Sequence, residues 1–137
     1  MSDKPVVRPL PKFNEPDTAE FWAGTKEQEF RYQQCENCQK IIFYPRRTCT
    51  GCTDSQLVWK VSQGIGKIYT FSIIRLSYHP FFKQKLPYVV AWIDLDEGPR
   101  ILSNVVGCDA EDVKIGADVK LEWEIHEDLN IPLFKPI

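Results

Sequence analysis

Two Cys-x-x-Cys pairs constrain the fold of this 137-residue chain more than any other feature. The pairs are Cys35/Cys38 and Cys49/Cys52, and the ten residues between them are enough for a short strand and a return. Each pair can form a tight turn that points two thiolates at one point, and four thiolates in tetrahedral geometry are the standard environment of structural zinc. Such a centre is coordinatively full. The spacing therefore predicts a zinc site that holds the fold and does no chemistry at the metal.

Three other interpretations of these cysteines stay open. Two disulfides would need an oxidising compartment and usually an export signal, and the first residues contain no apolar run of signal length. A thioredoxin-type redox pair would follow a strand and open a helix, whereas Thr50 and Gly51 indicate a turn. Iron accepts the same sulfur ligands as zinc. The fifth cysteine, Cys108, lies far from both pairs and is expected to be a semi-buried thiol without a role.

The charges of the chain nearly cancel, at a net −2. Residues 1–63 carry nine basic and eight acidic side chains, and residues 64–137 carry eight basic and eleven acidic ones. Generic nucleic-acid binding takes most of its affinity from neutralised phosphates, so the acidic second half argues against such a module. Residues 37–53 are a local exception, because they contain no acid but include Lys40, Arg46 and Arg47. This basic face is either an anion site or a set of solvated loop charges.

Pattern and punctuation predict a mainly β protein in three parts. Residues 1–29 form an extended proline-rich arm and a short helix over 16–25, with Pro16 in its first turn and Gly24 as its terminator. Phe21 and Trp22 of that helix either cap the protein's own core or pack on a partner. Residues 30–61 form the zinc ribbon, and residues 62–137 form the last part.

The pattern of residues 62–137 predicts a series of short strands. We expect strands at 67–76, 88–95, 100–106, 118–125 and 131–134, with a hairpin turn at 96–98 and at most one helical turn at 110–113. In the fourth strand Val119, Leu121, Trp123 and Ile125 should face inward, because they alternate with charged or polar residues. Five short strands with one helical interruption suit a small Greek-key barrel of the OB type.

Taken in order, these motifs resemble the family catalogued as domain of unknown function thirty-five. The resemblance covers the chain from about residue 15 to its end. Gln39 departs from the pattern, because a glycine often follows the first Cys-x-x-Cys pair. The matching segments are residues 21–24, 35–38, 43–46, 49–52, 66–72, 87–98, 112–116 and 132–136.

The resemblance implies an N-terminal helical segment, a rubredoxin-like zinc ribbon and a C-terminal OB fold associated with acyl-CoA chemistry. It also implies a role as accessory subunit beside a thiolase-like catalytic partner in a hetero-oligomer, where the two chains share a coenzyme A thioester. The partner would bring the nucleophile and the oxyanion hole. His79 and His126 lie in no recognisable catalytic motif, so we expect no catalytic residue in this chain.

Two sets of residues are our candidates for contacts with coenzyme A. Lys40, Arg46 and Arg47 could bind its phosphates, because a guanidinium fork can bind phosphate with two parallel bonds. The loop over residues 77–86 could line the acyl end or contact the partner, or it could fold back over the barrel as a hydrophobic flap. Its candidate contact residues are Tyr78, His79, Phe81 and Phe82.

Two rival functions remain at this point. One is a single-stranded nucleic-acid module with Trp59, Tyr69, Phe71 and Trp92 as a stacking platform, although aromatic residues in strands are expected in the core. The other is a purely structural adaptor for an acyl-CoA hydratase or aldolase, with no ligand of its own. Since no stretch approaches the length of a membrane span, we expect a cytoplasmic protein without a membrane partner.

Overall fold

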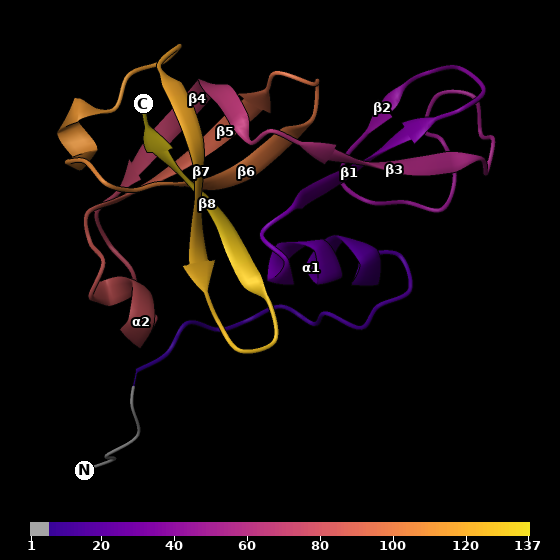
Figure 1. Ribbon diagram of the computed structural model, residues 1–137. Helices are drawn as coiled ribbons and strands as arrows, with labels where there is room; N and C mark the ends of the chain where they lie inside the picture. The colour runs from indigo at the N-terminus through magenta and orange to yellow at the C-terminus, as the bar shows by residue number, and fades with distance from the viewer. Residues whose placement is uncertain (1–5) are drawn as a thin grey trace.

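A three-stranded ribbon sheet and a closed five-stranded barrel make up the fold, with one helix beside the junction between them (Figure 1). The computed structural model describes residues 6–137, so the first five residues of the predicted arm lie outside the described part. Within it, no helix has the length and apolar character that crossing a membrane requires. The predicted β class with a short helix, a ribbon and a five-stranded barrel is confirmed.

The ribbon sheet has β1 at its centre, in the order β2-β1-β3. Both neighbours run antiparallel to β1, which pairs along its whole length with β3 but at only two positions with β2. The strand bounds are β1 Phe30–Cys35, β2 Ile41–Ile42 and β3 Leu57–Ser62. The first metal-ligand candidate, Cys35, is therefore fixed at the end of the central strand.

The barrel closes in the order β4-β5-β6-β8-β7, with β7 pairing back to β4. β4 begins at Ile65, two residues before the predicted strand start, and the predicted turn after β5 connects it to β6. The remaining helical pieces are a short α2 inside the loop after β4 and one 3₁₀ turn, η1. The bounds are β4 Ile65–Ile74, α2 Pro80–Lys83, β5 Tyr88–Leu95, β6 Arg100–Val105, η1 Ala110–Asp112, β7 Asp118–Ile125 and β8 Asn130–Pro136.

The barrel is weakest where β6 meets β8. These two strands run parallel and pair at a single position, Val105 with Phe134. Further along, the hydroxyl of Ser103 donates to the carbonyl of Pro132 at 2.7 Å, so a side chain bridges the strands. Two surface grooves include residues from both strands of this seam.

The helix α1, Ala19–Lys26, differs from the prediction at both ends. Pro16 lies in a turn before the helix, and Gly24 is a buried residue inside it. A Cβ atom at Gly24 would lie 2.6 Å from the side chain of Arg31, so this glycine allows close packing and does not terminate the helix. Thr25 then fixes α1 to the barrel, because its hydroxyl accepts from the backbone N–H of Asn130 and its carbonyl accepts from the Asn130 side chain.

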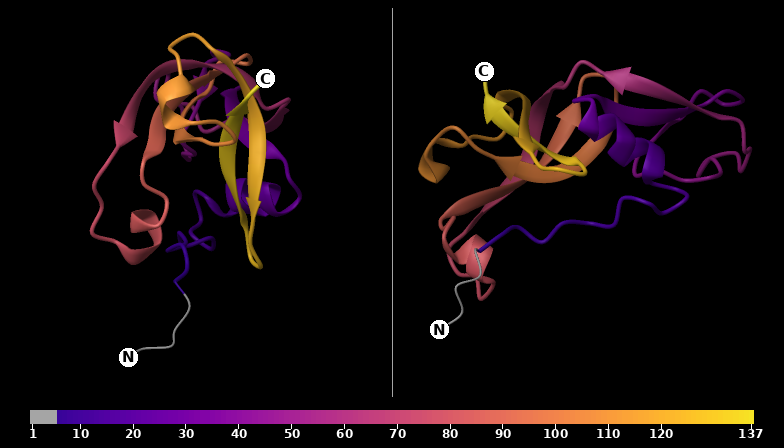
Figure 2. Two further views of the ribbon diagram at one scale, coloured as in Figure 1. Left: turned by 90° about the vertical axis from the view of Figure 1, so that its left-hand side faces the viewer. Right: turned by 60° about the horizontal axis from the view of Figure 1, so that its bottom comes forward.

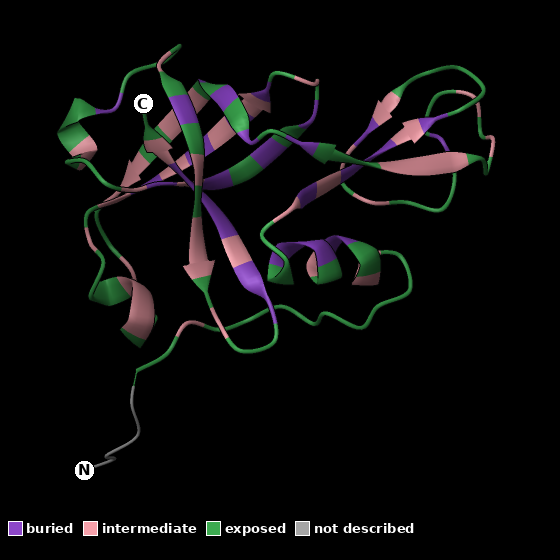
Figure 3. Ribbon diagram, in the orientation of Figure 1, coloured by how far each residue is buried: buried purple, intermediate pink, exposed green. Residues whose placement is uncertain are grey.

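One core cluster includes residues of the ribbon, α1 and the barrel, and a second, smaller cluster holds Cys35, Ile42 and Cys49. Figure 3 colours the buried residues purple. Alternate residues of β5 face inward, from Val89 to Leu95. Phe21 of α1 is 5% exposed and its ring meets those of Phe30 and Phe43 at centroid distances of 5.5 and 5.6 Å. Phe21 thus packs on the protein's own core, which is one of the two alternatives that we predicted for the aromatic residues of this helix.

Two predictions of burial are wrong. Ile125 at the end of β7 is 61% exposed, while its neighbour Glu124 is partly buried, because the strand reaches the N-terminal arm there and Glu124 pairs with Arg8. Tyr69, expected in the core, is 53% exposed. The pairing of β4 with β5 shifts register between Ile68 and Thr70, and this irregularity leaves Tyr69 on the surface, under the guanidinium of Arg100.

Candidate functional site

The structure brings Cys35, Cys38, Cys49 and Cys52 together, with all four sulfur atoms within 4.8 Å of one another. The Sγ atoms of Cys35 and Cys52 are 3.5 Å apart, as are those of Cys38 and Cys49. Four thiolates around zinc at 2.3 Å would be about 3.8 Å apart, so the cluster fits a tetrahedral ion with little movement. The distances are those of separate thiols, and disulfides would place the sulfurs near 2 Å.

The two Cys-x-x-Cys turns are built alike. In each, the residue after the second cysteine takes a left-handed backbone, with φ of 67° at Gln39 and 65° at Thr53. In each, that residue donates its N–H to the carbonyl of the first cysteine, at 2.9 Å for Gln39 and 3.0 Å for Thr53. Gln39 therefore keeps the turn that a glycine would favour, and its side chain adds a bond to the carbonyl of Glu36.

Amide groups around the cluster favour its thiolate form. Hydrogen bonding from Asn37, followed by backbone bonding at Asp54, lowers the pKa of Cys52 to about 6. Backbone N–H groups of Cys52 and Gly51 also lower the pKa of Cys49, against the effect of burial. The neighbouring thiols raise the pKa of Cys38 to about 12, although a backbone bond at Lys40 acts in the opposite direction. A bound cation removes this mutual repulsion, since metal binding requires deprotonated sulfur.

The predicted phosphate contacts lie on the ribbon, near the cluster. Arg47 pairs with Asp17 at 2.5 Å, although both side chains are largely exposed. Lys40 and Arg46 are exposed, and the backbone of Arg46 is held through its N–H and carbonyl by the side chain of Gln33. The three cations therefore stand on a backbone that the metal centre and β1 hold in place.

The predicted acyl contacts lie on and before α2, at the opposite end of the molecule from the ribbon (Figures 1 and 2). Phe81 and Phe82 are partly buried, and Phe82 packs on Tyr88 at 5.6 Å. His79 is the N-terminal cap of α2, because its Nδ1 accepts from the N–H of Phe81. Tyr78 is 89% exposed. The structure thus does not bring the phosphate and acyl candidates into one site.

Two surface grooves flank the seam between β6 and β8. The first, the α2 groove, has a volume of about 230 Å³ and is lined chiefly by Phe82, Tyr88, Val89, Val105 and Leu133. The second, the ribbon groove, has a volume of about 310 Å³ and is lined chiefly by Trp22, Phe43, Tyr44, Leu102 and Pro132. Arg8 and Asn104 line both grooves.

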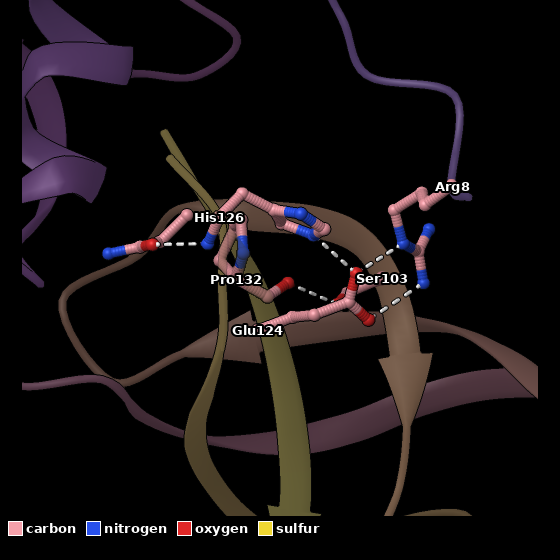
Figure 4. A network of polar contacts seen from close by, with 6 residues as sticks. Arg8, Ser103, Glu124, His126 and Pro132 are labelled. Atoms are coloured by element: carbon pink, nitrogen blue, oxygen red, sulfur yellow. Dashed lines mark hydrogen bonds and ion pairs between the residues drawn. The ribbon is translucent and has the colours of Figure 1, made fainter. Parts of the chain in front are cut away.

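Arg8, Glu124 and His126 anchor the N-terminal arm, and no motif in the sequence predicts their contact (Figure 4). Arg8 binds both carboxylate oxygens of Glu124, at 2.5 and 3.1 Å, and its guanidinium lies over the rings of Phe81 and Phe82. His126 contacts the same carboxylate at 2.7 Å. Burial raises the pKa of Glu124, but the bonds from Arg8 and His126 outweigh it and the pKa lies below its usual range.

The second cluster of interest joins the ribbon to the barrel. The hydroxyl of Tyr44 accepts a hydrogen bond from the backbone N–H of Leu102 in β6, at 3.0 Å. On the other side, the carboxylate of Glu97 accepts from the hydroxyl of Ser62 and from the N–H of Gln63. These bonds tie the ribbon to the barrel at two points, Leu102 in β6 and Glu97 in the turn between β5 and β6.

Fold and site define a class: a four-cysteine ribbon joined to a small closed barrel through a shared core. Residues 22–58 match the family described as "ChsH2, rubredoxin-like zinc ribbon domain", and residues 59–124 match "ChsH2, C-terminal OB-fold domain". A relative from Methanocaldococcus jannaschii, a "DUF35 domain-containing scaffold protein", is 39% identical over 69% of this chain and 68% of its own length. The chain belongs to this DUF35 family.

Two further relatives are named after a hydratase and an aldolase. A "probable enoyl-CoA hydratase alpha subunit" of Thermomonospora curvata is 31% identical over 96% of this chain, which spans only 40% of that subunit. The solved structure titled "Ltp2-ChsH2(DUF35) aldolase" contains a chain that is 30% identical, with a TM-score of 0.82 over 94% of this chain and 98% of that one. Membership of a zinc-ribbon family favours zinc for the cysteine cluster and argues against a redox pair.

Proposed function

We propose that this chain is a non-catalytic accessory subunit of an acyl-CoA enzyme, which docks on a thiolase-superfamily partner and helps hold the coenzyme A thioester. Its four-thiolate centre stiffens the ribbon and takes no part in the reaction. The relatives support an accessory role, since they are named as a scaffold, as a hydratase subunit and as part of an aldolase.

The observation that carries the proposal is that Arg8 and His126 both bind the carboxylate of Glu124, the one acidic side chain among the described residues that line the α2 groove. A general base works best with a pKa near 7, but Glu124 is held ionised, with its pKa lowered by Arg8 and His126. Burial and two nearby aspartates raise the pKa of Cys108, so this exposed thiol stays protonated and is a poor nucleophile. The grooves of the described chain thus offer apolar walls, the ion pair of Arg8 with Glu124 and the cation of Lys85, which suit binding better than catalysis.

The ribbon cations are our candidates for the coenzyme A phosphates in the assembled enzyme. Arg46 and Lys40 are exposed and near the metal centre, and Arg47 could exchange Asp17 for a phosphate at small cost, because an exposed ion pair contributes less than about 1 kcal/mol. α2 lies at the end of the barrel far from the ribbon (Figure 1). The acyl group would therefore contact the α2 candidates only if the partner positions it at that end; these candidates are Tyr78, His79, Phe81 and Phe82. Contact of coenzyme A with the ribbon cations does not require contact with the α2 residues, and the reverse also holds.

Binding to purified partners tests this proposal. The metal-loaded chain is mixed with thiolase-, aldolase- and hydratase-type acyl-CoA enzymes from its own organism, and complex mass is measured by light scattering. We expect a stable complex with a thiolase-superfamily enzyme. The double variant Arg46→Glu/Arg47→Glu should keep the complex but weaken its affinity for coenzyme A about tenfold or more, since charged hydrogen bonds contribute about 1.5–3 kcal/mol each.

The matched control is Arg75→Glu, because Arg75 is equally exposed and pairs with Glu111 away from the ribbon. Equal coenzyme A affinity in both variants would remove the ribbon cations from the site. A complex with none of the three enzyme classes would contradict the accessory role itself.

The names of the relatives favour one second candidate, a purely structural adaptor for a hydratase or an aldolase. It differs from the first in that coenzyme A does not touch this chain. A structure of the complex with a coenzyme A ester separates the two candidates directly.

A further inference from the structure

One side chain of the N-terminal arm is packed against the barrel. Of residues 6–17, Arg8 alone is not exposed, and its side chain is only 13% exposed although Val7 and Leu10 beside it are 65% and 44% exposed. Arg8 lies against Glu124, Phe81 and Phe82, where it forms part of the wall of the α2 groove. The arm therefore contributes a cation to a groove whose other walls belong to the barrel and α2.

One cation that lines the α2 groove has no ion-pair partner among the described residues. Three charged side chains line the groove: Arg8, Lys85 and Glu124. Arg8 and Glu124 form an ion pair through two hydrogen bonds. Lys85 is exposed and lies over the ring of Phe81, with Nζ 5.4 Å from its centroid, and within residues 6–137 no carboxylate stands at ion-pair distance from it. Asp109 and Asp112 lie near Cys108, another lining residue, so the positive charge is local to Lys85.

The apolar part of the groove is deep enough to hold a short chain. Its volume is about 230 Å³, and its floor includes the buried residues Val89, Val105 and Leu133. Tyr88 and Phe82 form one side, and Ala110 of η1 forms the opposite rim. Burial of an aliphatic chain here would be favourable by about 25 cal/mol per Å² of apolar surface.

We propose that the α2 groove binds a small apolar monoanion, a short-chain or medium-chain carboxylate, with its tail among the barrel residues and its charged group at Lys85. Arg8 flanks the charged end, because its guanidinium lies against the same Phe81 ring, 5.0 Å from the centroid. The local positive charge at Lys85 and the apolar walls together favour this class over neutral alcohols and cations. The site belongs to the isolated chain and needs neither a partner nor coenzyme A.

Calorimetric titration of the full-length, metal-loaded chain with octanoate tests this assignment. We expect saturable binding of one octanoate per chain, with 1-octanol and octylamine binding at least about tenfold more weakly, because neither places a negative charge beside Lys85. Lys85→Gln should weaken octanoate about tenfold while leaving the affinity for 1-octanol unchanged. Lys83→Gln is the matched control, since Lys83 lies on α2 but does not line the groove.

A second variant tests the position of the tail. Ala110→Phe should narrow the rim and abolish octanoate binding, while circular dichroism and metal content show that the chain is folded. Absence of saturable octanoate binding to the wild-type chain would overturn the proposal. The proposal would also be overturned if Lys85→Gln and Lys83→Gln lost the same amount of octanoate affinity, or if the wild-type chain bound octanoate and 1-octanol equally well.

Discussion

Tyr44 in the ribbon and Leu102 in β6 share a hydrogen bond of 3.0 Å, in which the phenol oxygen accepts the backbone N–H of an outer barrel strand. Leu102 lies where β6 has separated from β8, so this N–H has a side-chain partner in place of a strand. The bond joins the segment between the two cysteine pairs to the edge of the barrel. Ribbon order and barrel-edge order are coupled through it.

Replacing Tyr44 with phenylalanine removes only this bond. We expect Tyr44→Phe to lower the free energy of unfolding by about 0.5–1.5 kcal/mol, toward the low end because Tyr44 is 45% exposed and water can reach Leu102. Amide exchange should accelerate at Leu102 before other β6 positions. Tyr78→Phe, at a residue 89% exposed, is the control and should change neither quantity. Unchanged exchange at Leu102 in Tyr44→Phe would show that the bond contributes nothing.

Removal of the metal should unfold the ribbon and spare the barrel. The segment of residues 33–54 is too short to bury a core of its own, so metal affinity supplies its folding energy. After chelation we expect fast hydrogen exchange over these residues and retained protection in β5. Elemental analysis should find one zinc per wild-type chain, none in Cys35→Ser, and one in Cys108→Ser. If the analysis finds iron in place of zinc, the identity of the ion changes but the four cysteine ligands stay the same.

The left-handed backbone at Gln39 and Thr53 predicts an unusual stabilising change. A non-glycine residue in this region costs about 1 kcal/mol or more, so Thr53→Gly should raise the midpoint of thermal unfolding of the metal-loaded chain. Both changes also lose a side-chain bond, from the Thr53 hydroxyl to the carbonyl of Cys52 and from the Gln39 amide to the carbonyl of Glu36, and each loss reduces the gain. Thr53→Ala provides the comparison, since alanine keeps the steric penalty. A lower midpoint for glycine than for alanine would contradict the assigned backbone.

Acid should release the N-terminal arm. In the folded chain the pKa of Glu124 lies below its ordinary value of 4.5. The ion pair of Glu124 with Arg8 is therefore fully formed above pH 4.5 and is lost as the pH falls through the lowered pKa. Nuclear magnetic resonance of the Arg8 Nε–H between pH 7 and 2 should show one transition below pH 4.5. Glu124→Gln should show the released signal at pH 7. A wild-type transition above pH 4.5 would contradict the assignment.

Nucleic-acid binding should be absent or weak. The barrel half of the chain is acidic, and Tyr69, the most exposed aromatic of the possible platform, is already covered by Arg100. Filter binding of single-stranded DNA and RNA across a salt series measures this directly. Appreciable affinity with a steep salt slope would revive the nucleic-acid interpretation.

Local motifs account for what the sequence could predict. The spacing of the four cysteines in two short turns predicts their clustering. The alternation of apolar and other residues in β5 predicts which of its side chains are buried. These features depend on residues close in sequence. The same patterns, with Gly and Pro between the segments, gave the expected ribbon and barrel, and these two correspond to the matched ribbon and OB-fold families.

Long-range contacts explain what the sequence could not show. Arg8 and Glu124 lie 116 positions apart, and no pattern in the arm distinguishes Arg8 from Lys12 as the residue that reaches the barrel. Their pairing also explains why Ile125 turns outward at the end of an otherwise alternating strand. Tyr69 is exposed because of a register shift, which depends on the partner strand as much as on β4 itself.

The central claim, that this chain supports acyl-CoA chemistry without performing it, is tested most directly by reconstituted turnover. Acyl-CoA consumption is measured for the metal-loaded chain, for a thiolase-superfamily partner from its organism, and for the two together. The account predicts no turnover by the chain, and at least about tenfold higher kcat/KM for the complex than for the partner alone, which corresponds to about 1.4 kcal/mol of transition-state stabilisation. Turnover by the isolated chain at a rate close to that of the complex would contradict it.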